Sequence, residues 1–288
     1  MRNFEYFAPK TTRQAVRLLA KYQGQAKLLA GGTDLFLRMR QRVVLPEVVI
    51  DLKRIRSLAG LRYSSQKGLR IGATVTHAEV EQHPAVRRHY GALAEAASWV
   101  GSPQTRHRGT VVGNLCNASP AADTAPALIA YGATVHIAGP HGERTVPVEA
   151  FFQGPGKTVL GPDEMVVAVS LPPPQGRHGW GFSRRTRTAI DIALVSACCV
   201  AWAEGNACRD VRISLGAVAP TPLRATAAEE VLRGQRPTPE RLAEAARLAA
   251  AACRPISDVR CSAAYRQETA AVLTRRCLEA AFAMLGLR

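Results

Sequence analysis

The sequence predicts an α+β protein of two domains, an N-terminal domain over residues 1–175 and a C-terminal domain over residues 177–288. Three observations lead to this prediction. The 288 residues exceed the usual size of one domain, about 100–200 residues. Strand-like and helix-like apolar stretches alternate in the first half, whereas strands precede helices in the second. Between the halves, Pro172 to Gly176 stops an apolar strand and is typical of a linker.

The N-terminal domain is expected to have two lobes, about residues 1–55 and 56–175. In the first lobe, apolar spacing predicts a βαβ-like order, with a helix over 12–22, a strand over 27–30, a short helix over 35–40 and a buried strand over 47–52. In the second lobe we expect a short helix at 76–81 capped by Thr76 and another at 92–100. The strands expected there are 69–73, 134–137, 144–148 and 164–171.

The C-terminal domain begins with three expected strands, over 181–186, 192–202 and 211–218. The connection between the second and third is short and turn-like, which favours an antiparallel sheet. Alanine-rich helices follow over 225–232, 239–252 and 263–285.

The stretch KLLAGGTDL, from Lys27 to Leu35, reads as a strand that runs through two glycines into a helix. Glycine allows backbone angles closed to other residues, and a helix start offers unpaired N–H groups to an anion. The residues concerned are Lys27, Leu28, Leu29, Ala30, Gly31, Gly32, Thr33 and Asp34. A phosphate or pyrophosphate would fit there. The alternative is a strand-to-helix turn capped by Thr33 or Asp34, with no ligand.

A second glycine-bearing stretch, TVVGNLCNASPAAD from Thr110 to Asp123, reads as a tight loop, with Ser119 and Pro120 at the start of a small apolar helix. Two such loops suggest a ligand with an extended phosphate-bearing part.

Composition narrows the possible functions. No apolar run reaches the about 18–20 residues of a membrane span, and the start MRNFEYFAPK carries no export signal, so we expect a cytoplasmic protein. Seven cysteines without CxxC spacing predict reduced thiols and no metal site.

The net charge of +16 comes without any nucleic-acid-binding motif, and aromatics are only 6%. We therefore do not expect nucleic-acid binding, and the charge is explained as well by a generally Arg-rich proteome, or by a basic surface facing acidic partner subunits together with some charge near a pyrophosphate.

Several catalytic patterns fail on inspection. Gly156-Lys157-Thr158 looks like the end of a P-loop, but Phe151 stands where the first glycine is needed. GxGxxG and GxSxG patterns are absent, and the histidines have no HExxH partner, so they are expected to be structural or exposed. We therefore predict no catalytic side chains, as suits a protein whose cofactor supplies the chemistry.

The stretches Ala30–Asp34 and Thr110–Asn114 resemble the two FAD-binding loops of the flavoprotein (medium) subunit of the molybdenum hydroxylases. That family includes xanthine dehydrogenases, aerobic carbon monoxide dehydrogenases and N-heterocycle dehydrogenases. The resemblance runs from FEYFAPKT through RIGATVTHAEV, GPGK and DEMVVAVSLPPP to IDIALV. It implies a two-lobed PCMH-type (vanillyl-alcohol-oxidase-like) FAD-binding domain, followed by a C-terminal domain of antiparallel sheet plus helices.

The resemblance also implies roles for individual residues. Lys27 through Asp34 would wrap the pyrophosphate and ribityl region. Asp123 would hydrogen-bond the sugar-like part of FAD, unless it merely caps or covers the helix it precedes. The second wall would be formed by Gly109, Thr110, Val111, Val112, Gly113 and Asn114, and the apolar position beside the isoalloxazine ring by Val166 with Met165.

Two positions depart from the family pattern. Val112 replaces the first glycine of the usual TxGGN loop, which would cost FAD affinity if that position needs a positive φ. Ser183, with Arg184 beside it, stands where the family usually has a lysine near the flavin. An arginine can stabilise negative charge but cannot donate a proton.

The function implied is that of an FAD-binding electron-transfer subunit. Electrons would come from [2Fe–2S] clusters in a small partner subunit, and hydroxylation of a small heterocyclic substrate would occur at a molybdenum cofactor in a large one. FAD would pass the electrons to NAD⁺ or another acceptor, within a heterotrimer or a dimer of heterotrimers. The alternatives are a stand-alone flavin reductase on the same fold and a basic binding module that has lost FAD.

Overall fold

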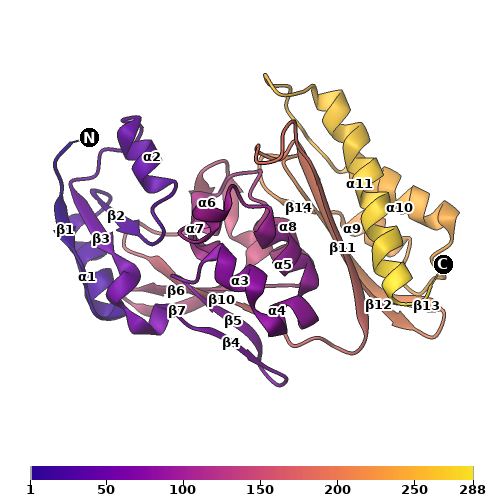
Figure 1. Cartoon of the computed structure of the whole chain (residues 1–288), viewed down its shortest axis with the longest axis horizontal. Helices are drawn as coiled ribbons and strands as arrows, with labels where there is room; N and C mark the ends of the chain where they lie inside the picture. Colours follow the sequence, from indigo (N-terminus) through magenta and orange to yellow (C-terminus); the bar gives the residue numbers. More distant parts are fainter. Residues whose placement is uncertain (1, 288) are drawn as a thin grey trace.

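The structure is a computed structural model that describes residues 2–287. These residues form a small parallel sheet, a five-stranded sheet and a four-stranded sheet, each packed against helices, together with a two-stranded hairpin (Figure 1). The three larger sheets follow one another along the long axis of the molecule. The α+β fold class predicted from the sequence is confirmed.

The first lobe is a three-stranded parallel sheet in the order β1-β3-β2. Its first helix begins where the Thr11 side chain accepts a hydrogen bond from the N–H of Gln14, and it buries the apolar face predicted from the sequence. The elements in chain order are β1 (Glu5–Phe7), α1 (Thr12–Tyr22), β2 (Ala26–Leu29), α2 (Leu35–Arg40) and β3 (Val48–Asp51).

The second lobe is a five-stranded antiparallel sheet in the order β4-β5-β10-β6-β7. Six short helices gather beside it (Figure 1). The strands are β4 (Leu61–Ser64), β5 (Gly68–Gly72), β6 (Thr134–Gly139), β7 (Gly142–Pro147) and β10 (Met165–Leu171). The helices are α3 (His77–Gln82), α4 (Pro84–His89), α5 (Gly91–Ser98), α6 (Pro103–Arg106), α7 (Val111–Asn117) and α8 (Thr124–Ala130).

Short elements complete this half of the chain. They are the 3₁₀ turns η1 (Leu52–Arg54), η2 (Arg56–Leu58) and η3 (Val148–Ala150), and the hairpin of β8 (Phe152–Gly154) and β9 (Lys157–Thr158).

The stretch after Thr110 corrects the sequence prediction. Residues 111–117 form helix α7 rather than a tight loop, because the Thr110 side chain caps the helix by accepting a hydrogen bond from Gly113 N at 3.0 Å. Ser119 and Pro120 lie in the turn that follows, and the next helix begins only at Thr124. The cap signal at Thr110 was present in the sequence, but Gly113 made the stretch read as a loop.

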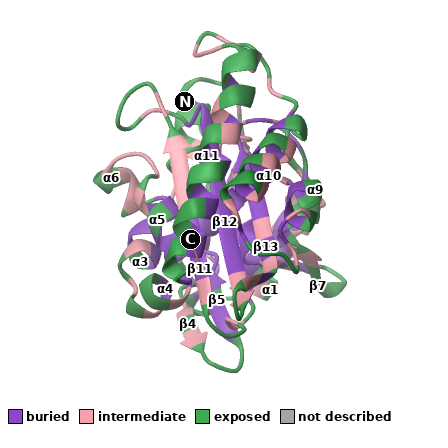
Figure 2. Ribbon diagram, turned by 90° about the vertical axis from the view of Figure 1, so that its right-hand side faces the viewer, coloured by how far each residue is buried: buried purple, intermediate pink, exposed green. Residues whose placement is uncertain are grey.

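The C-terminal part is a four-stranded antiparallel sheet in the order β11-β12-β13-β14, followed by helices. The strands are β11 (His178–Arg185), β12 (Val195–Glu204), β13 (Ala207–Gly216) and β14 (Leu223–Arg224). The helices are α9 (Thr226–Glu230), α10 (Pro239–Ala251) and α11 (Ala263–Met284), and the last two cover one face of the sheet (Figure 2).

Strand β12 contributes to two hydrophobic cores. Cys198 and Val200 belong to the core of the N-terminal half, whereas Val195, Ala197, Cys199 and Ala201 belong to the core beneath α10 and α11. The two sets alternate along the strand because successive side chains point to opposite faces of a sheet. The four-stranded sheet is therefore packed between helices of both halves.

Within residues 2–287, no helix is long and apolar enough to cross a membrane. The division of the chain at Pro172 to Gly176 stays a prediction, and the shared packing on β12 means that the two halves are not separate bodies.

Candidate functional site

A cleft of about 690 Å³ lies where the two glycine-bearing stretches meet. One side is the segment from Lys27 to Leu35, at the carboxyl end of β2, and the other is the segment from Gly109 through the first turns of α7. Most of the predicted site residues line this cleft, namely Lys27, Leu28, Ala30, Gly31, Gly32, Thr33, Asp34, Gly109, Thr110, Val112, Gly113, Asn114 and Val166.

The first loop presents unpaired main-chain donors to the cleft. Among the contacts within residues 2–287, the backbone N–H groups of residues 31–34 donate no hydrogen bond. Gly32 holds φ at +81°, a conformation that favours glycine. Asp34 precedes α2 without capping it through its side chain. A row of free N–H groups before a helix is the arrangement that binds phosphate oxygens.

Gly31 brings the two loops into contact. A Cβ atom at this position would lie 2.0 Å from the carbonyl oxygen of Arg108 and 2.9 Å from Cα of Gly109. A side chain here would therefore force the two backbones apart. The need for glycine at position 31 comes from this close approach rather than from a positive φ.

Val112 lies in the first turn of α7, and its φ is not positive. The departure from the family's glycine therefore causes no backbone strain. The side chain is 4% exposed and lines the cleft, so its effect on a ligand is a matter of contact and space.

Met165 and Val166, the two residues predicted to lie beside the isoalloxazine ring, point to opposite faces of their strand. Val166 lines the cleft, whereas Met165, its neighbour on β10, is fully buried in the core. Leu29 and Val111 are likewise buried among apolar side chains and do not line the cleft.

Asp123 and Arg184 form a buried ion pair between α8 and β11. Arg184 Nη1 donates to Asp123 Oδ2 at 2.8 Å and to the carbonyl oxygen of Trp99 at 2.9 Å, and its side chain is only 3% exposed. Burial raises the pKa of Asp123 to about 7, although Arg184 opposes this rise. The other carboxylate oxygen, Oδ1, is buried without a hydrogen-bond partner within residues 2–287.

Asp123 stands at the N-cap position of α8, but its side chain makes no cap hydrogen bond to that helix. Its role toward a ligand stays a prediction. Asp123, Ser183 and Arg184 do not line the cleft. The start of α8 is nevertheless tied to the cleft wall, because Thr124 Oγ1 donates to Asn114 Oδ1 at 2.9 Å.

Sequence reasoning missed several residues that line the cleft, among them Arg38, His77, Thr105 and Asn117. His77 is 1% exposed, and its Nδ1 has no hydrogen-bond partner in the part of the chain that the structure describes. Burial, with a contribution from Arg106, lowers the pKa of His77 to about 4, so the ring is neutral at pH 7. The only sequence signal for His77 was its place in the THAEV stretch.

The residues present fit an FAD molecule. The cleft volume lies within the about 300–1,000 Å³ typical of cofactor sites. Free N–H groups and absent side chains at Gly31 and Gly32 suit a pyrophosphate, and the buried unpaired atom His77 Nδ1, on a residue that lines the cleft, offers a partner for a polar group of the cofactor. Within residues 2–287, no cluster of histidine, cysteine or carboxylate side chains suits a metal ion.

A cleft with free amide donors at the carboxyl end of a parallel sheet defines this chain, by class, as a protein that binds a phosphate-bearing cofactor. Comparison with known proteins makes the class specific. Residues 2–174 match the family model described as the FAD binding domain in molybdopterin dehydrogenase. Residues 180–281 match that of the CO dehydrogenase flavoprotein C-terminal domain. The chain belongs to the family of FAD-binding medium subunits of molybdenum hydroxylases.

Individual relatives are similar over nearly their whole length. The carbon monoxide dehydrogenase medium chain of Hydrogenophaga pseudoflava is 37% identical over 280 residues, which cover 97% of each chain. The xanthine dehydrogenase FAD-binding subunit of Escherichia coli O157:H7 is 31% identical, covering 98% of this chain and 97% of the relative.

Solved structures agree. A chain of the Hydrogenophaga pseudoflava carbon monoxide dehydrogenase superposes with a TM-score of 0.95 at 37% identity, and covers 98% of both chains. A chain of quinoline 2-oxidoreductase from Pseudomonas putida 86 superposes with a TM-score of 0.91 at 31% identity, also covering 98% of both.

Proposed function

We propose that the cleft between the two glycine-bearing loops holds FAD, and that this chain is the electron-transfer subunit of a molybdenum hydroxylase complex. The observation that carries the proposal is the row of unpaired backbone N–H groups at residues 31–34, in the loop that lines the cleft where the two loops touch. Main-chain donors at this position bind the pyrophosphate, and Lys27 and Arg38 add positive charge.

The second wall fixes the rest of the cofactor. Gly109 to Asn114 close the cleft opposite the first loop, and Val166 packs against the flavin ring from β10. His77 offers a neutral ring nitrogen from the cleft wall, and Asp123, which lies outside the cleft, would support that wall through its neighbour Thr124, which donates to Asn114. Leu29, Val111 and Met165 support these contacts from the core, and Arg184, with Ser183 beside it, holds Asp123 in place.

When bound, FAD accepts electrons singly and releases them as a pair. The chain positions it between a small partner subunit with [2Fe–2S] clusters and an acceptor, NAD⁺ or another. A large partner subunit carries the molybdenum cofactor at which a small heterocyclic substrate is hydroxylated. The subunits form a heterotrimer or a dimer of heterotrimers, in the cytoplasm.

The test is the absorption spectrum and metal content of the complex purified from its native host, alongside the isolated chain incubated with FAD. We expect a flavin spectrum in the chain, joined in the complex by iron–sulfur absorbance and molybdenum. A chain that stays colourless with FAD, purified without a metal-bearing partner, would contradict the proposal.

Carbon monoxide is a second candidate substrate, because medium chains of carbon monoxide dehydrogenases are 37% and 34% identical to this chain, beside 35% for a nicotinate dehydrogenase FAD-subunit. Assaying the purified complex with carbon monoxide and with N-heterocycles, using the same artificial acceptor, decides between them: the substrate that reduces the flavin identifies the class.

A further inference from the structure

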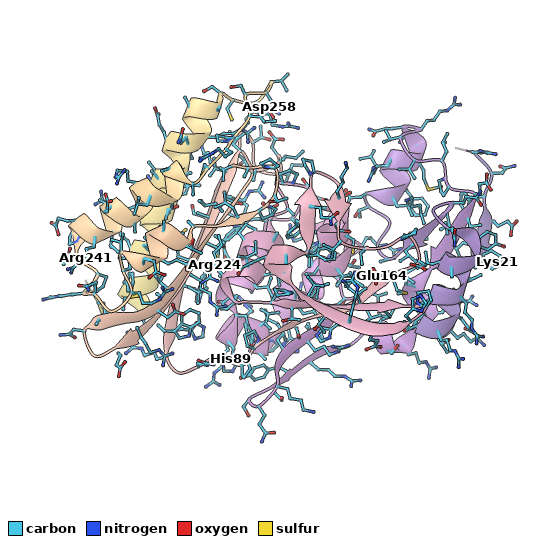
Figure 3. All side chains as sticks on the ribbon, turned by 180° about the vertical axis from the view of Figure 1, so that it is seen from behind. Lys21, His89, Glu164, Arg224, Arg241 and Asp258 are labelled. Carbon is cyan, nitrogen blue, oxygen red and sulfur yellow. The ribbon has the colours of Figure 1, made fainter. Side chains whose placement is uncertain are left out.

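A second cavity, of about 210 Å³, lies where α4, α5 and α8 meet the linker and the four-stranded sheet. It shares no lining residue with the first cleft. His89, labelled in Figure 3, is one of the residues that line it. The walls are aromatic, with the rings of Tyr90 and Tyr131 at 5.3 Å between centroids and those of Tyr131 and His178 at 6.1 Å, both edge to face.

Most polar side chains in these walls already have partners. Tyr90 Oη donates to the carbonyl oxygen of Pro172 at 2.8 Å, and Tyr131 Oη accepts from the N–H of Ala92 at 3.3 Å. Two donors do not. Trp202 Nε1 and Arg212 Nε are buried atoms without a hydrogen-bond partner within residues 2–287. Buried donors normally have an acceptor, so two at one cavity indicate a missing one.

The guanidinium of Arg212 is unpaired as a whole. None of its N–H groups donates a hydrogen bond to any residue in the described range, and no carboxylate lies within ion-pair distance. It lies over the ring of Trp202, 5.9 Å from the centroid. A partly buried charge without a counter-charge is costly, so an anion at this place would relieve that cost.

The guanidinium of Arg212 lies against the turn after α8. A Cβ atom at Gly132 would lie 2.0 Å from Arg212 Nη1, the end of a flexible side chain that could move aside. It is the φ of +68° that favours glycine at this position.

The charge of the cavity is positive. Arg209 and Arg212 line it, and the one carboxylate there, Asp210, is paired with Arg233 at 3.1 Å. Burial lowers the pKa of His178, whose ring is therefore neutral at pH 7. The volume is below the about 300–1,000 Å³ of sites for drug-sized ligands, so a ligand here is small.

We propose that this cavity binds a small planar anion, of the class of a single aromatic ring with one carboxylate, at the junction of the two halves of the chain. The carboxylate accepts from Arg212 and Trp202 Nε1, and the ring packs against Tyr131 and His178. This site is separate from the flavin cleft and does not depend on the proposed function.

The test uses 4-fluorobenzoate as the probe and the FAD-incubated full chain, with binding followed by ¹⁹F NMR titration. We expect saturable binding to the wild type, at least tenfold weaker binding to Arg212→Gln, and weaker binding to Trp202→Phe. The matched control is Arg87→Gln, an exposed arginine on α4 that loses the same charge but does not line the cavity. It should bind like the wild type.

A neutral probe, 4-fluorobenzamide, tests the need for negative charge and should bind at least tenfold more weakly. Circular dichroism checks that the variants are folded. If Arg212→Gln does not fold, the affinity of Trp202→Phe for 4-fluorobenzoate tests the proposal instead, because this variant loses the Nε1 donor but keeps an aromatic wall. No saturable binding by the wild type at millimolar 4-fluorobenzoate, equal binding by the cavity variants and Arg87→Gln, or equal binding of the benzamide would each overturn the proposal.

Discussion

Gly31 shows how a single residue couples the two loops of the flavin cleft. Its Cα hydrogens face the carbonyl of Arg108, and no other amino acid fits between these backbones without moving one of them. The glycine pair was visible in the sequence, but the reason for Gly31 was not, because Arg108 is far along the chain and only the fold brings it near.

We predict that Gly31→Ala weakens FAD binding at least tenfold and lowers the free energy of unfolding by about 2 kcal/mol, because the added methyl group separates the loops. Flavin fluorescence titration and urea denaturation measure the two effects. The control is Gly60→Ala, where the nearest atom to the new Cβ is the flexible Arg62 side chain at 3.3 Å. Wild-type flavin affinity in Gly31→Ala would show that the loops do not need this contact.

Because His77 is buried and neutral, we predict that the folded chain becomes less stable as the pH falls. Its pKa falls from an ordinary 6.5 to about 4 in the folded chain, chiefly through burial. The unfolded chain therefore takes up a proton first, so stability is full above pH 6.5 and is lost as the pH falls toward 4. Between pH 7.5 and pH 5, the effect of this one residue should lower the free energy of unfolding by about 2 kcal/mol.

His77→Gln has no such proton to take up, so its free energy of unfolding should fall by about 2 kcal/mol less than that of the wild type over the same interval. Urea denaturation at pH 7.5 and pH 5 measures the difference. Parallel pH profiles for the two proteins would mean that His77 is solvated in solution and does not titrate as a buried group.

At the scale of the element, helix α7 illustrates what the sequence could and could not predict. The positions of α1, α2 and α3, with the cap of α3 at Thr76, were predicted because their apolar spacing is regular. Helix α7 has seven residues, one more than α2 or α3, so its length did not hide it; Gly113 made the stretch read as a loop. The small strands β1, β4, β8, β9 and β14 were missed because each has too few residues to show an apolar pattern.

The capping threonine of α7 carries a prediction. Thr110→Ala removes the acceptor for Gly113 N, which should lower the free energy of unfolding by about 1 kcal/mol and weaken FAD binding, because α7 forms a wall of the cleft. Thr238→Ala removes the equivalent cap of α10, whose acceptor bond to Arg241 N is 3.4 Å, far from the cleft. Thr238→Ala should lower the free energy of unfolding without changing FAD affinity. If both variants lost FAD affinity equally, the role of α7 in the cleft wall would be contradicted.

At the scale of the whole molecule, the C-terminal sheet depends on both halves of the chain. Three of its four strands, β11, β12 and β13, were predicted from their apolar runs, and the antiparallel order from the short connection between β12 and β13, whereas β14 was not predicted. The packing of helix α8 against β12 and β13 was not predictable, because a fully apolar strand does not reveal which partner covers each face. Ser214 Oγ donates to the carbonyl oxygen of Pro126 at 2.5 Å across this junction.

We therefore expect a fragment of residues 177–288, produced alone, to lack a fixed tertiary structure. The sheet face that α5 and α8 normally cover would be exposed, with Trp180, Phe182 and Val200 among its side chains. Near-UV circular dichroism and dye binding to exposed apolar surface measure this. The intact chain serves as the control, and a cooperative melting transition in the fragment would show that the second core is sufficient.

The alternation along β12 limits how the gene for such a chain can change length. Inserting one codon within the strand would exchange the faces of every following residue, so that Cys198 and Val200 would turn toward α11 and leave the flavin half of the protein unsupported. Insertions are tolerable at the linker near Gly176 or at the exposed turn of Gly205 and Asn206, where no alternation has to be kept. Natural variation in length should therefore collect at those places, and chimeras between relatives should be joined there.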